Sequence, residues 1–418
     1  MQTQVAAPRT RTTLDLTTAL VALSVMLVGT ARTVHLSLTI GTVVGVALAP
    51  LWLGALRRYR GAPVFAALCC ALPVAGWWLT ESASADHRTS SRLLLSTVLV
   101  ILNVLVAVGI LLWARLRMRT ETVAVLLGLG MVLGIGREGR FAENPWRFGL
   151  AIPLTVLLLA LAWRSGRRWL EVVLALVLAL VTALSGGRST FALLLVAGAV
   201  VAWQATAQVV TGKAASRTRV VLLVGVLGFA VYQVGQGLIL DGYLGESAQE
   251  RTAAQIQQSG SVLLGGRPEL GATLALVARQ PTGFGAGTLP SVQDVATAKT
   301  GMARLGYDPN NGYVENYMFG NAFEVHSILG DAWMLYGLTG VVFVAVTLWI
   351  VLSAVVEQIA RRAAPALLVF LALWLVWNTL FSPLYSSSPY LAATVGLALA
   401  LRAPRGEAAA VPETRPRT

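Results

Sequence analysis

Charged residues are scarce in this sequence. They make up 12% of its 418 residues, whereas hydrophobic residues make up 56%, and the mean hydropathy is +0.71. A soluble domain has about a quarter of its residues charged to cover its surface, so this composition excludes a soluble globular protein. The few charges gather in short clusters between long apolar runs, which is the pattern of a chain surrounded by lipid.

Cysteine and histidine are also rare. The two cysteines, Cys69 and Cys70, are neighbours inside an apolar run, and the sequence has only three histidines. Adjacent cysteines in such a run offer neither a disulfide framework nor the spacing of a metal site. The sequence also lacks an Asp-x-Asp motif or a His/Cys cluster that would indicate a divalent cation. We therefore predict no metal site and no cofactor.

The net charge of +13 at pH 7 raises the question of a nucleic-acid partner. Nucleic-acid-binding proteins gather their basic residues on one face, with aromatic residues among them. Here Lys and Arg instead stand at the ends of apolar runs, where the positive-inside rule places them on the cytoplasmic side of a membrane. The sequence therefore predicts the lipid bilayer as a partner and no nucleic acid.

Long apolar runs are abundant. A membrane-spanning helix needs about 20 apolar residues. Ten runs approach or reach this length, and a further uncharged stretch is long enough for two helices: 16–30, 33–56, 61–80, 93–114, 122–136, 148–163, 169–187, 189–207, 220–240 and 332–356, with 363–401 as the stretch. We therefore predict an all-α, polytopic membrane helix bundle of about 12 transmembrane helices.

This series divides the chain into four parts. Transmembrane helices 1–9 occupy residues 1–240, a large external loop covers 241–324, helices 10–12 occupy 325–402, and 403–418 form a disordered cytoplasmic tail. With both termini cytoplasmic, 20 of the 32 Lys and Arg residues fall in the termini and the short cytoplasmic loops, and this sets the orientation.

The external loop between helices 9 and 10 holds most of the chain outside the membrane. A loop of this length is usually functional. Residues 246–258 are good helix formers, and 268–280 have apolar residues at helical spacing. We expect helices over both segments, and irregular chain over 281–320, which is rich in Gly, Pro and Asn.

Arg188 stands alone between two apolar runs at the predicted outer face, within the sequence SGGRST. A guanidinium placed there without compensation costs free energy unless an anion meets it. Its planar fork donates two parallel hydrogen bonds to phosphate oxygens. Two interpretations stay open: a ligand for a phosphate or pyrophosphate, or an arginine that snorkels to the membrane interface.

His326 stands where the external loop returns to the membrane. Gly337 and Gly340 follow it at distances of eleven and fourteen residues. The other two histidines, His35 and His87, fall in no motif, and we expect substitutions there to be nearly silent.

Three further segments accompany this His-Gly-Gly pattern. They are Asn144–Pro145, the Gly-Arg-Ser-Thr segment 187–190, and Arg267 with the glycine-rich segment 281–287 fourteen residues later. In this order, and on this side of the membrane, the four elements resemble the motifs of the O-antigen ligase and polymerase superfamily of bacterial membrane proteins. Ser327 departs from the family pattern, which usually has Asn after the histidine.

The resemblance implies a metal-independent membrane glycosyltransferase of cell-surface polysaccharide biosynthesis. Such an enzyme moves a glycan from undecaprenyl pyrophosphate to an acceptor hydroxyl, at the outer face of the bacterial cytoplasmic membrane. Ligase and polymerase both fit: a ligase passes a finished polymer to a different acceptor, whereas a polymerase extends a chain of the same repeats.

The resemblance also implies roles for particular residues. His326 would be the catalytic base, because a neutral imidazole can take the proton of an acceptor hydroxyl near pH 7. Glu324 either orients His326 or is a solvated loop carboxylate. Guanidinium groups would stabilise the charge on the departing pyrophosphate. The candidates are Arg188 and Arg267, with Arg140 and Arg279 as outer alternatives.

The main alternative is a secondary transporter or lipid flippase. Such proteins usually have paired repeats and broken or polar helices at the bilayer midplane. The sequence has no internal repeat, and few polar residues such as Asn103 and Gln204 fall within the apolar runs. The glycosyltransferase is therefore the favoured hypothesis.

Overall fold

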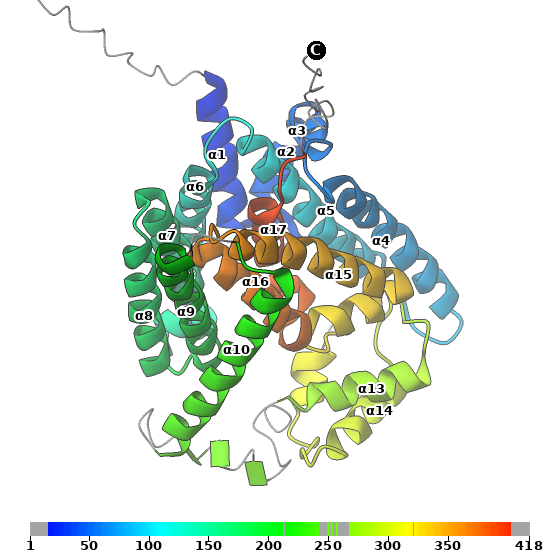
Figure 1. The fold of residues 1–418 in the computed structure, drawn as a ribbon. Helices are drawn as coiled ribbons and strands as arrows, with labels where there is room; N and C mark the ends of the chain where they lie inside the picture. Colours follow the sequence, from blue (N-terminus) through cyan, green and yellow to red (C-terminus); the bar gives the residue numbers. More distant parts are fainter. Residues whose placement is uncertain are drawn as a thin grey trace, which may run out of the picture.

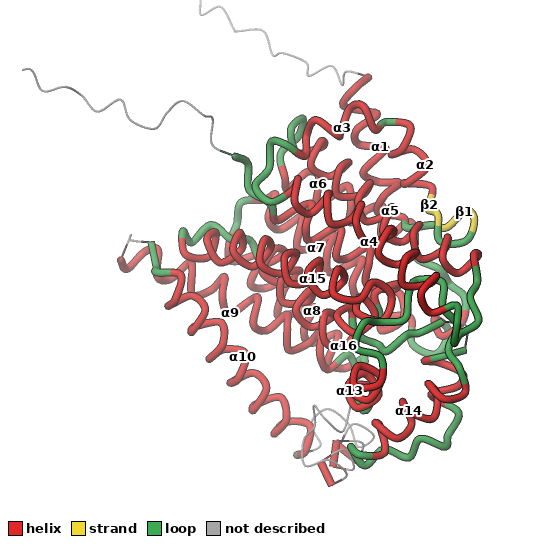
Figure 2. The backbone as a smooth tube through the Cα atoms, turned by 90° about the vertical axis from the view of Figure 1, so that its right-hand side faces the viewer, coloured by secondary structure: helices red, strands yellow, loops and turns green. Residues whose placement is uncertain are grey.

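The computed structural model describes residues 16–211, 214–241, 267–320 and 322–402, with the pairs 249–250, 252–253 and 256–257. Within these residues the fold is an all-α helical bundle (Figures 1 and 2), as predicted. The strands in this part of the chain are β1 (Thr33–His35) and β2 (Leu38–Thr39), which form one small antiparallel hairpin.

The helices of the described residues follow one another in chain order. They are α1 (Leu16–Thr30), α2 (Ile40–Ala47), α3 (Ala49–Leu56), α4 (Ala62–Ala83), α5 (Ser91–Ala114), α6 (Thr120–Leu133), α7 (Ala151–Ser165), α8 (Arg168–Leu184), α9 (Arg188–Thr211), α10 (Arg217–Leu240), α13 (Glu269–Arg279), α14 (Val292–Ala303), α15 (Ile328–Ala360), α16 (Ala366–Phe381) and α17 (Leu384–Ala398). Three single turns complete the set: η1 (Gly139–Phe141), η2 (Trp146–Leu150) and η3 (Val314–Met318).

Six helical segments of the described chain are long and apolar enough to cross a membrane. They are Ala62–Ala83, Ser91–Ala114, Trp146–Ser165, Arg188–Thr206, Arg217–Gly237 and Ile328–Ala360. Large apolar side chains such as Trp78, Phe229 and Trp349 lie exposed on them, which water would disfavour and lipid accommodates. The chain therefore has the architecture of a membrane protein.

One predicted span is not a single helix. Residues 33–56 contain the β1–β2 hairpin and then two eight-residue helices, α2 and α3. Pro50 stands in the first turn of α3, where its missing N–H costs nothing and a new helix readily starts. Hydropathy alone did not reveal this division, because every part of the run is apolar.

The loop after α10 is more helical than its composition indicated. The helix expected over 268–280 is present as α13, whereas the one expected over 246–258 lies largely outside the described residues. The expectation of irregular chain over 281–320 was right only in part, since α14 and η3 form within it. Ser291 and Asp294 start α14 with a reciprocal capping box, which satisfies two backbone N–H groups.

The glycine-rich segment 281–287 packs against a break in α15. Gly337 has φ +58° and ψ −141°, a backbone conformation that other residues avoid. The break leaves the Met334 carbonyl open to accept two bonds, from the N–H of Phe284 at 2.8 Å and of Gly285 at 3.0 Å. A Cβ on Gly283 would lie 2.5 Å from the carbonyl oxygen of Trp333. The glycines therefore serve close backbone packing.

Candidate functional site

His326 lies two residues before α15 and has a strained backbone. Its φ is +57°, in the left-handed region that costs a non-glycine residue free energy and persists only when the surroundings enforce it. The imidazole is half-buried, and its Nδ1 lies 3.3 Å from the carbonyl oxygen of Glu324. A carbonyl only accepts hydrogen bonds, so in the neutral ring Nδ1 carries the hydrogen and Nε2 is the basic nitrogen.

Asp331 holds the His326 segment in place. One carboxylate oxygen accepts the N–H of Val325 at 2.7 Å, and the other accepts the N–H of Leu384, the first residue of α17, also at 2.7 Å. Asp331 is only 2% exposed, and a buried carboxylate is tolerated when its oxygens are hydrogen-bonded. The same side chain therefore ties the residue before His326 to the start of α17.

Tyr313 and Glu269 pack beside the imidazole. The ring centroid of Tyr313 is 5.9 Å from that of His326, and its hydroxyl donates to Glu269 Oε1 at 2.6 Å. Burial raises the pKa of Tyr313, and the Glu269 charge raises it further, whereas Arg267 opposes this with a smaller effect. The phenol therefore stays protonated and keeps donating to Glu269.

Arg267 reaches the end of α16, next to this group. Its Nη1 donates to the carbonyl of Phe381 at 3.1 Å, and its guanidinium lies over the rings of Phe381 and Trp377 at 5.3 and 5.7 Å. A cation at a helix C-terminus is favoured by the helix dipole. Since Phe381 ends α16 and Leu384 begins α17, the contacts of Arg267 and Asp331 both converge on the α16–α17 turn.

Arg188 begins α9, which packs along α16. The Gln204 side chain bonds both the N–H and the carbonyl of Ala364 at 3.0 Å, so late α9 meets the residues just before α16 and the two helices are antiparallel. With a rise of 1.5 Å per residue, Arg188 and Phe381 both lie about 25 Å from that contact. Arg188 is therefore at the same level of the bundle as Phe381, which accepts the hydrogen bond of Arg267. Nη1 of Arg188 donates to the hydroxyl of the buried Thr252 at 2.8 Å.

The Asn144–Pro145 element joins the turn that carries Arg188. Asn144 Nδ2 donates to the carbonyl of Ser185 at 3.1 Å, and the indole of Trp146 donates to Thr182 at 3.1 Å. The Asn144–Pro145 element therefore contacts the residues that lead into segment 187–190. Arg140, in contrast, is exposed: it pairs with Glu143 at 3.1 Å and covers the ring of Phe148 at 4.0 Å, and no described contact brings it to His326.

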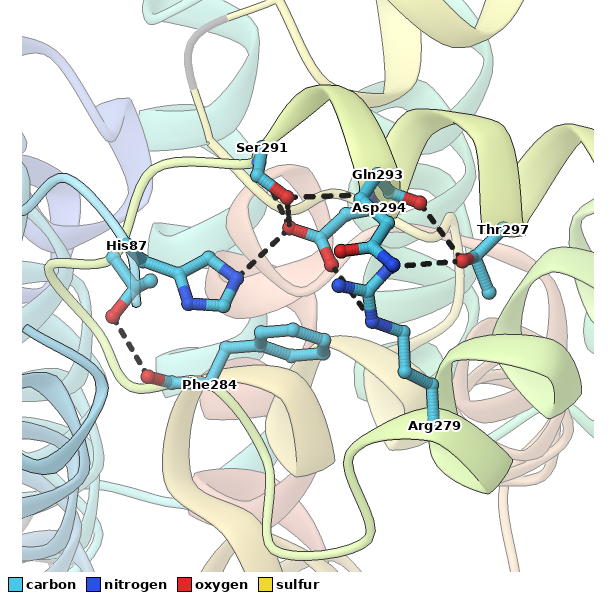
Figure 3. Close-up of polar contacts among 8 residues, drawn as sticks. His87, Arg279, Phe284, Ser291, Gln293, Asp294 and Thr297 are labelled. Carbon is cyan, nitrogen blue, oxygen red and sulfur yellow. Dashed lines mark hydrogen bonds and ion pairs between the residues drawn. The ribbon is translucent and has the colours of Figure 1, made fainter. Parts of the chain in front are cut away.

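Arg279 belongs to a different polar cluster (Figure 3). It donates to Thr297 at 3.1 Å, and its Nε lies 3.8 Å from Oδ1 of Asp294, which is fully buried. Oδ2 of Asp294 accepts from the N–H and hydroxyl of Ser291, and lies 3.0 Å from Nε2 of His87. The guanidinium of Arg279 is thereby committed to holding α13 and α14 together.

This cluster resembles a Ser-His-Asp triad only in composition. The Ser291 hydroxyl and the His87 imidazole both face the same carboxylate oxygen, whereas a nucleophilic serine needs to donate to the histidine. His87 instead fastens the α4–α5 connection to α14. His87 therefore makes a structural contact that the sequence did not indicate, whereas His35 is exposed in β1.

Three residues of the site were not found from the sequence: Asp331, Glu269 and Tyr313. Asp331 left a signal, since it is an acidic residue inside an apolar run five residues after His326. Glu269 and Tyr313 left none, because 44 residues separate them. Among the described residues, no group of three or more His, Cys, Asp or Glu side chains is placed to hold a metal ion.

No protein-family model, curated protein or solved structure matches this chain.

Proposed function

We propose that this chain is an O-antigen ligase-like glycosyltransferase that moves a glycan from undecaprenyl pyrophosphate to an acceptor hydroxyl. The observation that carries the proposal is the placement of His326. Its strained backbone is held by the Asp331 segment beside the α16–α17 turn, where Arg267 binds, and Arg188 lies at the same level. A proton acceptor and two guanidinium groups are the groups that this reaction needs.

The reaction balances with these groups alone. Nε2 of His326 takes the proton of the acceptor hydroxyl while the acceptor oxygen attacks the anomeric carbon of the donor sugar. The bond from that carbon to the pyrophosphate oxygen breaks, and the electron pair leaves with the pyrophosphate. Arg188 and Arg267 would stabilise the charge that develops there, because each can donate two parallel hydrogen bonds to phosphate oxygens.

We also propose the finer membrane topology: twelve crossings in the bacterial cytoplasmic membrane, both termini cytoplasmic and residues 241–324 external. This topology is supported by contacts between loops that the distribution of Lys and Arg assigns to the cytoplasm. Arg60 N–H donates to Ala400 at 2.9 Å, and Ala215 N–H donates to Ala360 at 2.9 Å. The described ends of the chain lie at the end of the bundle opposite α13 and α14 (Figures 1 and 2). In this topology α2 and α3 make the second crossing together.

The transporter alternative has one feature in its favour, the break in α15 at Gly337. Transporters use broken helices because the freed carbonyls coordinate ions or substrates. Here the freed carbonyl of Met334 accepts the N–H groups of Phe284 and Gly285 instead. The break therefore holds a loop segment instead of an ion or a substrate, and this favours the transferase over the transporter.

A deletion strain tests the proposed reaction. Loss of the protein should abolish one surface glycan and cause its lipid-linked precursor to accumulate, and plasmid-borne wild type should reverse both effects, whereas His326→Ala should not. A polymerase deletion leaves single repeats on the lipid, and a ligase deletion leaves long chains. Unchanged surface glycan and lipid-linked pools in the deletion strain would reject the proposal.

A further inference from the structure

Three tyrosines form a row that leads to His326. The ring centroids of Tyr307 and Tyr313 are 6.2 Å apart, and those of Tyr313 and Tyr317 are 5.8 Å apart with an angle of 27° between the rings. Tyr313 lies next to the imidazole at 5.9 Å. Tyr317 follows Tyr313 by one turn, through η3, so the two rings stack on one side of that turn.

The row is fixed at its middle ring and open at the Tyr317 end. The hydrogen bond from Tyr313 to the buried Glu269 holds the middle ring at 2.6 Å. Tyr317, in contrast, is 69% exposed. Its large apolar face meets solvent beside the site, although burying such a face stabilises a protein. A ring held in this way suits a ligand that covers it.

Polar side chains accompany the row at its Tyr307 end. Asp308, Asn310 and Asn311 lie exposed on the segment between Tyr307 and Tyr313. The Asn311 amide donates to the Tyr307 hydroxyl at 2.8 Å, and Asp308 accepts the N–H of Asn310 at 3.0 Å. These contacts order the segment and leave further amide and carboxylate groups for hydrogen bonds with a ligand.

This combination fits a sugar ring. A pyranose has C–H groups on its faces and hydroxyls around its edge, so it matches an aromatic face with amide and carboxylate groups beside it. We propose that Tyr313 and Tyr317, with Asp308, Asn310 and Asn311, form a saccharide subsite that seats a sugar ring next to His326. This proposal rests on the proposed function, in which the sugar ring belongs either to the acceptor or to the donor glycan.

The other explanation for an exposed tyrosine in a membrane protein is an interfacial anchor. An anchor of that kind places its ring among lipid headgroups. Tyr317 instead stacks on a second ring, and the neighbouring segment carries three exposed polar residues. The geometry therefore favours the saccharide, and the experiment below separates the two.

Binding to purified full-length protein in lipid nanodiscs tests this subsite. The probe is the oligosaccharide pool that mild acid releases from the producing organism's extracellular polysaccharide, titrated by calorimetry. Tyr317→Ala should weaken binding roughly tenfold, as expected when one aromatic contact is lost. Tyr317→Phe keeps the ring and should stay within about twofold of wild type. Val292→Ala is the matched control, because Val292 is 89% exposed on the same loop and outside the row.

A second titration with glycan-loaded undecaprenyl pyrophosphate identifies the source of the sugar. Weaker binding of the free oligosaccharide by Tyr317→Ala assigns the subsite to the acceptor. Weaker binding of the glycan-loaded lipid alone assigns it to the donor glycan. Wild-type affinity of Tyr317→Ala for both probes would overturn the subsite. If Tyr317→Ala also inserted poorly into the membrane, Tyr317 would be an interfacial anchor. Sugar-free undecaprenyl pyrophosphate should bind equally to all variants.

The result of this binding test does not depend on whether His326 is the general base. A His326→Gln protein with wild-type transfer would end the general-base assignment, yet saccharide binding at Tyr317 would still be measurable in that protein. Conversely, wild-type saccharide binding by Tyr317→Ala would leave the role of His326 open to its own test.

Discussion

At the scale of single residues, two buried carboxylates organise the candidate site. Asp331 accepts the backbone N–H groups of Val325 and Leu384, and Glu269 accepts the Tyr313 hydroxyl. A buried carboxylate is expensive unless hydrogen bonds compensate it, so both positions restrict substitution. Their purpose is geometric: they fix the imidazole and the ring beside it.

Asp331→Asn should lower turnover at least tenfold while donor affinity stays near that of wild type. Asparagine has one acceptor oxygen where aspartate has two, so either the Val325 or the Leu384 N–H loses its partner, at a cost of about 1–3 kcal/mol. Initial rates and donor binding on the purified protein measure the two quantities. Thr347→Val is a matched control on the same helix, because the buried Thr347 hydroxyl has no described hydrogen-bond partner. Equal rates for Asp331→Asn and wild type would remove Asp331 from the site.

Glu324 gives the site a pH-dependent effect on stability. Burial raises the pKa of Glu324, and the nearby His326 opposes this with a smaller effect. A raised carboxyl pKa in the folded state contributes stability below the unfolded pKa, near 4.3, and that contribution is lost as the pH rises through the folded value. Glu324→Gln should therefore raise the melting temperature at pH 7 and have little effect at pH 4. A larger gain at pH 4 than at pH 7 would contradict this sign.

At the scale of elements, the break in α15 joins segment 281–287 to the bundle. Segment 281–287 bonds to the freed carbonyl of Met334, and the indole of Trp333 donates to the carbonyl of Pro281 at 3.2 Å. The His87–Asp294–Arg279 cluster makes a second attachment, between α14 and the α4–α5 connection. Two separate attachments therefore join the loop to the rest of the bundle.

Gly337→Ala should destabilise the protein clearly. A Cβ there would lie 2.4 Å from the carbonyl oxygen of Thr282, and the positive φ adds a strain of roughly 1–3 kcal/mol. Heating of detergent-solubilised protein, followed by size-exclusion chromatography, should give a lower melting temperature. Gly228→Ala is the control, because a Cβ at Gly228 in α10 meets no atom within 4 Å; it should be neutral or stabilising. A Gly337→Ala protein that melts like wild type would show that the stability of the protein does not need the break in α15.

At the scale of the whole molecule, the account depends on which end of the bundle faces outward. A labelling reporter on this loop should leave Ser291 intact, because Ser291 caps α14. In a Cys70→Ala background, Val292→Cys should react with an impermeant thiol reagent in intact cells, whereas Ala214→Cys should react only after lysis. Both positions are exposed, and native Cys69 is buried. The opposite labelling pattern would invert the topology.

The sequence predicted the helices well where hydropathy and length are sufficient. The run 93–114 matches α5, whereas the run 33–56 hid a hairpin and two short helices, although Pro50 marked the start of the second. His326 and Arg267 were recognisable because their motifs are local. Asp331 binds Leu384 across 53 residues, and packing alone makes that pair. Arg279 was a candidate ligand for the pyrophosphate because it is an arginine in the predicted outer loop. In the structure its guanidinium lies against the carboxylate of Asp294, and no local sequence pattern revealed this pairing.

The most direct test of the central claim is the transfer rate of His326→Gln. The purified variant, given lipid-linked donor and acceptor, should turn over roughly 10²–10⁴-fold more slowly than wild type, the usual contribution of positioned proton transfer. Glutamine keeps the polarity and approximate size of the imidazole but takes up no proton near pH 7, so donor binding should be unchanged. His35→Ala, at an exposed position in β1, should transfer at the wild-type rate. A His326→Gln enzyme as fast as wild type would contradict the account.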